Sequence, residues 1–360
     1  MKSLKENFQK AHIVIIGSGI IGKFNALELS ELGLRITIID PAEHKNSSNA
    51  ALGLLMGNMY QKRKGRSWDL RKQSIELWPK WIKFLQKFNY ELNIKKPLIQ
   101  LTTNEEKFKR LEKFIYENND QNLQILERES IFIKNINQAF QTKNLKGMIS
   151  FDDGRINAAS LLKTLDKYLK YKKINFVDEE IIKIRKSNNQ WFSTTKNNID
   201  IKSDIVILCN SLKTIDLIDY LSNNIKLKPV LGQAIEVGIN DAEVDLLTLP
   251  KHFNINGKNI IPISKNKLII GSTDEYSTNP EENIFDKITN FLDKKPTWLI
   301  NGQITKKWFG VRSRPEGEPS PIIKNLGDGL IICTGFYKNG ILLAPACSKW
   351  VANEIKNYFS

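Results

Sequence analysis

The chain has 360 residues and carries 54 Lys and Arg against 39 Asp and Glu, which gives a formal net charge of +15. Its 41% hydrophobic and 26% charged residues are typical of a globular protein and exclude a disordered or fibrous chain. No run of about 18 apolar residues occurs, so we expect no membrane span.

The positive charge bears on the kind of partner. It could favour nucleic acid, an anionic membrane surface or small anionic substrates, but it is scattered through Lys- and Asn-rich segments. The densest block, residues 61–66, is more simply a solvated loop before a helix, so a nucleic-acid partner is not expected. The cysteines, Cys209, Cys333 and Cys347, lack metal-ligand spacing and indicate a reduced, cytoplasmic protein without a metal site.

The first predicted elements are a strand, a glycine-rich turn, a helix and a second strand. Residues 12–16 are an apolar run expected to form a buried strand, and a helical pattern covers residues 23–32. Between them, residues 17–22 read G-S-G-I-I-G, the G-x-G-x-x-G of dinucleotide sites. The second strand, residues 34–39, ends at Asp40.

This spacing predicts a dinucleotide site. Gly17 allows a tight turn, Gly19 lets the backbone approach a pyrophosphate, and Gly22 lets helix and strand pack closely. The helix N-terminus offers N–H groups and a partial positive charge to the phosphates. An acid at position 40 would accept hydrogen bonds from the adenosine ribose and argues against NADP, whereas NAD and FAD both remain open. The cofactor-binding residues expected here are Gly17, Gly19, Ile20, Ile21, Gly22 and Asp40.

The middle of the chain is predicted to alternate between helices and short strands. Ser67 is expected to cap an amphipathic helix over residues 68–88, which Pro79 should kink or break. The segments after it are a strand over 97–102, a helix over 105–116, a turn over 152–155 and a helix over 158–171. Short strands at 174–177, 181–184 and 191–195 suggest an antiparallel meander, and residues 204–209 should continue the first sheet as a parallel strand.

The last third follows the same alternation. Its predicted elements are a strand over 228–237, a hairpin over 259–272 turning at 265–266, a helix over 279–294, an extended segment over 308–313, a buried strand over 330–334 and a closing helix over 342–358. Because the pieces alternate, we expect two interleaved domains rather than consecutive ones.

Several strings stand out: residues 17–22 with Asp40, residues 48–54, 153–157 and 229–233, Pro262 with residues 268–273, residues 310–312 and residues 339–345. Together they resemble one family, the FAD-dependent D-amino-acid oxidase superfamily, and within it the glycine oxidase type. The last string, N-G-I-L-L-A-P, is close to a signature of glycine oxidases. The resemblance covers nearly the whole chain and favours FAD over NAD.

The resemblance implies an α/β fold with a Rossmann-type FAD-binding domain interleaved with a smaller, antiparallel-sheet α+β substrate domain. We assign residues 1–90, 146–215 and 305–360 to the first and residues 91–145 and 216–304 to the second. Further cofactor contacts implied by the resemblance are Ser48, Ala50, Gly53, Leu54, Ile181, Asn210, Asn339, Gly340, Ile341 and Leu342.

The implied reaction is oxidation of a small amine or amino acid, such as glycine, sarcosine or a D-amino acid, to an imine. Hydride would move to flavin N5, with O2 or another acceptor reoxidising the flavin, and a glycine oxidase would serve thiamine biosynthesis. Arg312 matches the arginine that grips the substrate carboxylate, because a guanidinium binds both oxygens at once. Lys338 is the second catalytic candidate.

The chain also departs from the family pattern. Phe336 and Lys338 stand where a His and an Arg are common, and Asn259-Ile260-Ile261 precede Pro262 where an aromatic is usual. Asn210 lies in a Cys-Asn-Ser turn that replaces a small Ala/Gly-rich one. A second hypothesis is therefore a flavin-binding protein with lapsed turnover, or one that acts on a macromolecule such as tRNA. Homo-oligomerisation is left open.

Overall fold

A computed structural model describes residues 8–41, 47–218, 225–239 and 244–360. Its first sheet has six strands in the order β19-β20-β13-β1-β2-β9. Their bounds are β1 His12–Ile16, β2 Arg35–Ile39, β9 Asn175–Val177, β13 Ile205–Leu208, β19 Ile322–Asn325 and β20 Leu330–Thr334. β1 lies parallel between β2 and β13, so residues 204–209 continue the first sheet as predicted.

Alternate side chains of β1 enter two different cores. Ile13 and Ile15 pack with four helices on one face of the sheet, whereas Val14 and Ile16 pack with the apolar side chains on the other face. Side chains alternate between the faces of a strand, so an unbroken apolar run requires both faces to be covered. The helices are α2 Ile20–Glu31, α3 Arg66–Leu85, α6 Ala158–Tyr171 and α10 Gly340–Tyr358.

The opposite face of this sheet is covered by an antiparallel meander, which contains two of the three strands predicted for it; the first predicted strand, residues 174–177, forms β9 and pairs parallel with β2 instead. The meander consists of β10 Ile181–Ser187, β11 Gln190–Thr195 and β12 Asp200–Ser203, in that order. Ile184 and Trp191 from these strands are buried against Val206 and Leu208 of β13. The remaining elements nearby are the 3₁₀ turn η1 Ser211–Lys213 and α7 Thr214–Ile218.

The second large sheet has eight strands in the order β18-β14-β17-β16-β15-β5-β7-β6. Their bounds are β5 Leu98–Thr102, β6 Leu123–Leu126, β7 Lys146–Ser150, β14 Lys226–Gly238, β15 Phe253–Ile255, β16 Lys258–Ser264, β17 Lys267–Gly271 and β18 Gln303–Glu316. The helical elements of this half are α4 Glu105–Asn118, α5 Ile131–Phe140, η2 Leu246–Thr248, α8 Ile284–Thr289 and α9 Thr297–Ile300. Pairing is antiparallel except between β5 and β15.

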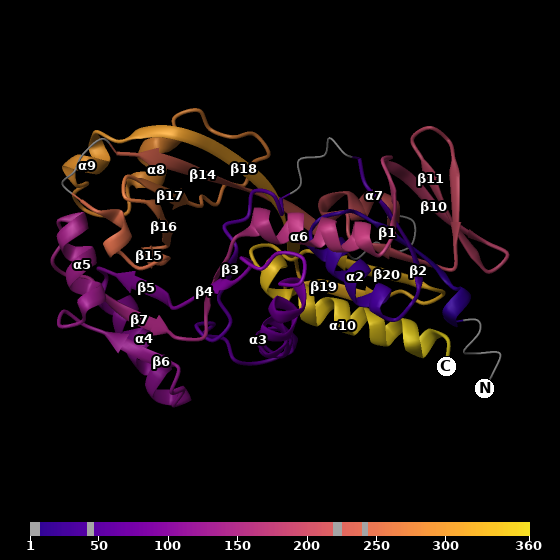
Figure 1. Ribbon diagram of the computed structural model, residues 1–360, viewed down its shortest axis with the longest axis horizontal. Coiled ribbons are helices and arrows are strands. Elements are labelled where there is room, and N and C mark those ends of the chain that lie inside the picture. The colour runs from indigo at the N-terminus through magenta and orange to yellow at the C-terminus, as the bar shows by residue number, and fades with distance from the viewer. Residues whose placement is uncertain (1–7, 42–46, 219–224, 240–243) are drawn as a thin grey trace.

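The two sheets form two bodies that lie side by side (Figure 1). β14 and β18 pair along their whole length and run from one body towards the other. A small sheet of β3 Leu54–Leu55, β8 Gly154–Ile156 and β4 Ile94–Lys95 lies between them. The predicted α/β class with interleaved parts is confirmed, and the domain limits assigned from the sequence stay a proposal.

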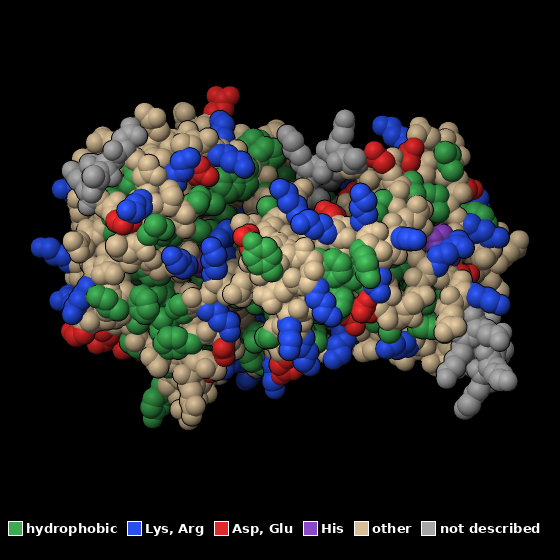
Figure 2. Space-filling model, in the orientation of Figure 1, with side chains coloured by type: hydrophobic (Ala, Val, Ile, Leu, Met, Phe, Trp, Pro, Cys, Tyr) green, Lys and Arg blue, Asp and Glu red, His purple; other side chains and the backbone are tan. Residues whose placement is uncertain are grey.

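Charged side chains are dispersed over the surface (Figure 2). Figure 2 shows Lys and Arg side chains spread over the visible face with Asp and Glu among them. Within the part of the chain that the structure describes, no helix is long and apolar enough to cross a membrane.

Three local predictions were wrong. The helix expected over residues 279–294 is limited to α8, Ile284–Thr289, which has Asn290 as its C-cap and is flanked by Pro280 and Pro296, where a helix cannot continue without losing a backbone hydrogen bond. Ser67 does not cap α3, which begins at Arg66; its hydroxyl instead donates to the Ser320 carbonyl at 2.7 Å. Pro79 does not break α3, one of the two effects predicted for it, because the helix continues to Leu85 with Trp78 and Ile82 buried on either side.

The short elements were less visible in the sequence. The predicted turn at residues 152–155 runs into strand β8, and α2 starts at Ile20 rather than at Lys23. The strands β3, β4, β6, β7, β12, β15 and β19 and the helices α5, α7 and α9 were not predicted. The two-residue strands among them have no period that a sequence pattern could reveal.

Candidate active site

The described part of the structure contains a cavity of about 400 Å³ at the carboxyl ends of β1, β2 and β13. In an open parallel sheet, ligands bind outside these strand ends. The cavity also reaches β18 and the loop before α10. Of the residues predicted from the sequence, those that line it are Gly17, Gly19, Ile20, Ile21, Asp40, Ser48, Ile181, Asn210, Arg312 and Gly340.

The glycine turn leaves no room for side chains. Gly17 has φ +106°, and a Cβ there would lie 2.6 Å from the Cys209 carbonyl oxygen. A Cβ at Gly22 would lie 1.9 Å from the carbonyl oxygen of Gly17. Gly22 therefore packs beneath the turn and does not line the cavity, which agrees with the packing role that its position predicted.

The start of α2 points its N-terminus at the cavity. The Ile20 amide donates to Ser48 Oγ at 3.0 Å, and a Cβ at Gly19 would lie 3.2 Å from the same oxygen. Since Ser48 Oγ already accepts from an amide, its own proton is left to donate to a phosphate. The first amides of a helix lack intrahelical partners and carry a partial positive charge, so this corner fits a pyrophosphate.

Asp40 closes the turn from the second strand. Its Oδ2 accepts hydrogen bonds from the Ser18 amide at 2.8 Å and from the Ser18 hydroxyl at 2.7 Å. Both bonds engage the same oxygen, and Oδ1 is the atom that could accept from a ribose hydroxyl. The carboxylate is thus already oriented before a ligand arrives.

The far end of the cavity is built by the loop before α10. Asn339 is the N-cap residue of α10 and its carbonyl accepts from the Leu343 amide at 2.9 Å, while Gly340 lines the cavity. The side chains of Ile341 and Leu342 are buried in the core. These two residues can therefore contribute only backbone N–H groups to a cofactor.

The segment from Ala50 to Leu54 makes packing and hydrogen-bond contacts and does not line the cavity. A Cβ at Gly53, which has φ +84°, would lie 1.8 Å from the Ile156 carbonyl, and Leu54 pairs with Arg155 between β3 and β8. The Ala50 carbonyl accepts from Trp308 Nε1 at 3.2 Å. These residues were predicted as cofactor contacts; the structure gives them packing partners and does not place them in the cavity lining.

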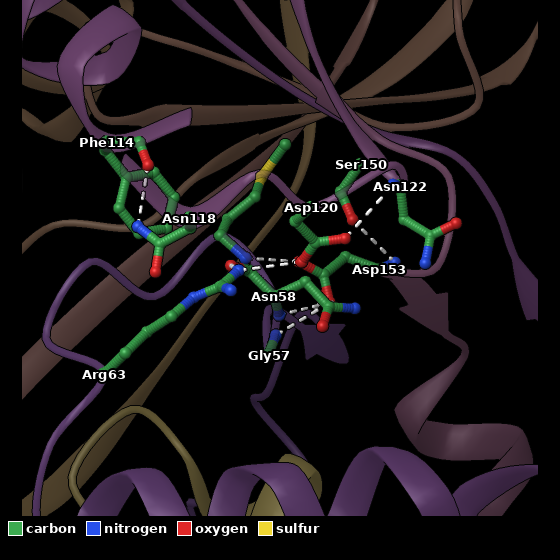
Figure 3. Close-up of polar contacts among 10 residues, drawn as sticks. Gly57, Asn58, Arg63, Phe114, Asn118, Asp120, Asn122, Ser150 and Asp153 are labelled. Atoms are coloured by element: carbon green, nitrogen blue, oxygen red, sulfur yellow. Dashed lines mark hydrogen bonds and ion pairs between the residues drawn. The ribbon is translucent and has the colours of Figure 1, made fainter. Parts of the chain in front are cut away.

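A buried carboxylate fixes the rest of this segment (Figure 3). Asp153 Oδ1 accepts from the amides of Gly57 and Asn58, each at 2.9 Å, and Oδ2 accepts from the Met59 amide at 2.8 Å. Burial raises the pKa of Asp153, and the three amides oppose that rise. Sequence reasoning had placed Asp153 in a turn and in the family string at residues 153–157 without a role, because its partners lie almost a hundred residues away.

Arg155 holds the beginning of the same segment. Its Nε donates to the Leu52 carbonyl at 2.7 Å, and burial lowers the pKa of Arg155 to about 10. At neutral pH the guanidinium remains charged. The string at residues 153–157 therefore acts by positioning residues 52–59.

Arg312 extends from β18 into the cavity, with 15% of its side chain exposed. Its Nη1 donates to the Thr273 carbonyl at 3.2 Å and to Asp274 Oδ1 at 3.0 Å, and its Nη2 donates to Ser272 Oγ at 2.7 Å. Burial lowers the pKa of Arg312, and the Asp274 carboxylate opposes that change. A fixed, partly desolvated guanidinium is well suited to bind a carboxylate.

Gly232 on the neighbouring strand makes room for this guanidinium. A Cβ at Gly232 would lie 2.0 Å from Arg312 Nη2 and 2.3 Å from Cζ. The sequence had marked residues 229–233 as a family string without a role. Only the pairing of β14 with β18 brings Gly232 beneath Arg312.

Lys338 lies beside Arg312 but does not line the cavity. Its ammonium pairs with Asp274 Oδ2, so a single carboxylate holds both predicted catalytic residues. Sequence reasoning missed Asp274, although it directly follows the string at residues 268–273.

The other end of the cavity holds Asn210, whose Oδ1 accepts from Thr214 Oγ1 at 2.8 Å. Ile181 is a buried apolar wall. In the described residues no group of three or more His, Cys, Asp or Glu side chains could hold a metal ion.

Known proteins are similar to this chain over nearly its whole length. Residues 12–354 match the family profile described as DAO, FAD dependent oxidoreductase. A glycine oxidase from Pseudomonas aeruginosa is 23% identical over 351 residues, which cover 95% of this chain and 93% of that protein.

Solved structures share the fold. The glycine oxidase from Bacillus cereus matches with a TM-score of 0.82 at 21% identity, covering 97% of this chain and 95% of that one. The L-alpha-glycerophosphate oxidase from Mycoplasma pneumoniae with FAD bound has a TM-score of 0.78 at 17% identity, covering 97% and 95%.

Proposed function

We propose that this protein oxidises the amine of a small amino acid to an imine. The premise is that the chain belongs to the DAO family of FAD-dependent oxidoreductases. Glycine, sarcosine and small D-amino acids are the substrates to test first. The observation that carries the proposal is the fixed guanidinium of Arg312 in the same cavity as the Gly17 turn. The similar proteins from Pseudomonas aeruginosa and Bacillus cereus are both named glycine oxidase, which supports the same substrate class.

The residues present fit FAD, because the turn excludes side chains where a pyrophosphate must approach. Gly17, Gly19 and the first amides of α2 would hold the pyrophosphate, and Asp40 would hold the adenosine ribose. The N-terminus of α10, at Gly340, would lie against the flavin and favour negative charge there. When bound, FAD supplies the acceptor for the hydride that leaves the substrate Cα.

The chain's own residues bind and orient the substrate. The guanidinium of Arg312 would hold the carboxylate, which fixes the position of the Cα–H bond. Apolar side chains such as Ile20 and Phe336 line the cavity and limit the access of water to the reacting carbon. The amine reacts in its neutral form, so no acid–base pair is needed for the oxidation itself. Water then hydrolyses the imine, and O2 or another acceptor takes the electrons.

The first experiment is the visible spectrum of the purified protein under anaerobic conditions, before and after each candidate substrate is added. We expect a flavin spectrum that bleaches with at least one of them. The Arg312→Ala variant should retain FAD but lose about 100-fold or more in kcat/KM, because hydrogen bonds to charged groups contribute about 1.5–3 kcal/mol each. Full activity of Arg312→Ala on carboxylate substrates would refute the assigned role.

A flavin spectrum that no amine bleaches would instead support the second hypothesis, a protein with lapsed turnover or a macromolecular substrate. The motivating observation is Lys338, which is held by Asp274 where the family commonly has an arginine. RNA binding that weakens steeply as salt is added would then indicate a nucleic-acid substrate.

A further inference from the structure

We propose that Asp274 determines substrate specificity by offsetting one of the two cations at the site, so that the site accepts a substrate with one carboxylate and disfavours a second one. The inference rests on the proposed function of Arg312 as the carboxylate-binding residue. It assigns a role to a residue that the sequence patterns did not single out.

Asp274 links Arg312 on β18 to Lys338 in the loop before α10. It lies shortly after the end of β17, at Gly271, and its two oxygens contact Arg312 Nη1, at 3.0 Å, and the ammonium of Lys338. Arg312 lies inside, with 15% of its side chain exposed, whereas Asp274 and Lys338 are 42% and 46% exposed at the rim. The carboxylate thus stands between the buried cation and the solvent-facing one.

The hydrogen-bond capacity of Arg312 sets a limit on what it can bind. A guanidinium has five N–H donors. Contacts with Thr273, Asp274 and Ser272 use three of them among the described residues. The two that remain match the two oxygens of one substrate carboxylate. A second carboxylate on the substrate would need Lys338, which Asp274 already holds.

Further charged groups lie around Asp274. Lys258 interacts with Asp274, and Glu275 interacts with Arg312. Glu275 accepts from Gln233 Nε2 at 3.1 Å and from the Thr273 hydroxyl, so its carboxylate is retained by its own partners. Asp274 is therefore the carboxylate that Arg312 and Lys338 share.

The test compares a monocarboxylate and a dicarboxylate as binding probes on the FAD-containing protein. Dissociation constants for acetate and malonate are measured at low ionic strength by calorimetry and by the change in flavin absorption, because salt screens exposed charges. In Asp274→Asn, which keeps an oxygen acceptor for Arg312, affinity for malonate relative to acetate should rise about fivefold. The matched control is Asp286→Asn, which removes an exposed partner of Lys295 outside the cavity and should leave the ratio unchanged.

The outcomes separate the inference from the proposed function. An unchanged ratio in Asp274→Asn, with both probes still bound through Arg312, overturns the inference and leaves the proposed function standing. Failure of both probes to bind the wild-type protein would refute the carboxylate site itself, and the inference with it. If Asp274→Asn does not fold, Asp274→Ser serves instead, because it also removes the carboxylate charge: the malonate preference should again rise about fivefold, and an unchanged preference would overturn the inference.

Discussion

Replacing Gly232 by alanine should disable substrate binding without touching the cofactor site. The new Cβ would lie 2.0 Å from Arg312 Nη2, 2.3 Å from Cζ and 2.5 Å from Nη1. An ordinary contact needs about 3.5 Å, so the guanidinium must move by roughly 1.5 Å. Such a shift breaks its hydrogen bonds with Ser272 Oγ and Asp274 Oδ1, which are 2.7 and 3.0 Å long.

The expected loss is large because the carboxylate and the reacting carbon move together. A misplacement of about 1 Å can cost about 100-fold in rate. We therefore expect kcat/KM of Gly232→Ala to fall about 100-fold, with a raised KM as the larger part because Arg312 binds the ground state too. FAD content should stay the same, since the residues proposed to hold FAD, such as Gly17, Gly19 and Asp40, lie on other elements than Gly232 and Arg312.

The assay is steady-state kinetics on the best substrate, with FAD content measured from the visible spectrum and folding from thermal unfolding. Gly238→Ala provides a control on the same strand, because among the described residues its Cβ would meet Thr305 Cγ2, at 3.0 Å, and Gln303 O, at 4.0 Å, and no part of Arg312. Wild-type KM and kcat in Gly232→Ala would refute the reasoning: either Arg312 has room to spare or it does not bind the substrate.

Two further predictions concern the cofactor and the pH dependence of stability. Asp40→Ala should weaken FAD binding about tenfold, because the carboxylate that Ser18 orients is lost; fluorescence titration of the apoprotein measures this, and unchanged affinity would contradict the assignment of Asp40. Burial lowers the pKa of His252 to about 3 from 6.5, so below pH 6.5 the unfolded chain binds a proton that the folded one does not. The free energy of unfolding should therefore fall by about 2 kcal/mol between pH 7 and pH 5. Urea unfolding at several pH values would measure this fall, and His252→Leu should reduce it. An equal fall in both proteins would contradict the prediction.

The sequence determined those parts of the site that depend on short-range spacing. Gly17, Gly19 and Gly22 fall at fixed distances along the chain between a strand and a helix, and the structure places Asp40, at the end of the second strand, against that turn. Strands with continuous apolar runs, such as β1 and β13, were predicted because burial on both faces leaves a signal within a few residues.

Only the tertiary structure decided the environment of Arg312. Its partners Ser272 and Asp274 lie about 40 positions away in sequence, and Gly232 lies 80 positions away on another strand. Likewise, Asp153 binds the amides of residues 57–59 across almost a hundred positions. A local pattern records which face of an element is apolar, but which side chains meet is set by the register of long-range strand pairs such as β14 and β18, and that register exists only in the folded chain.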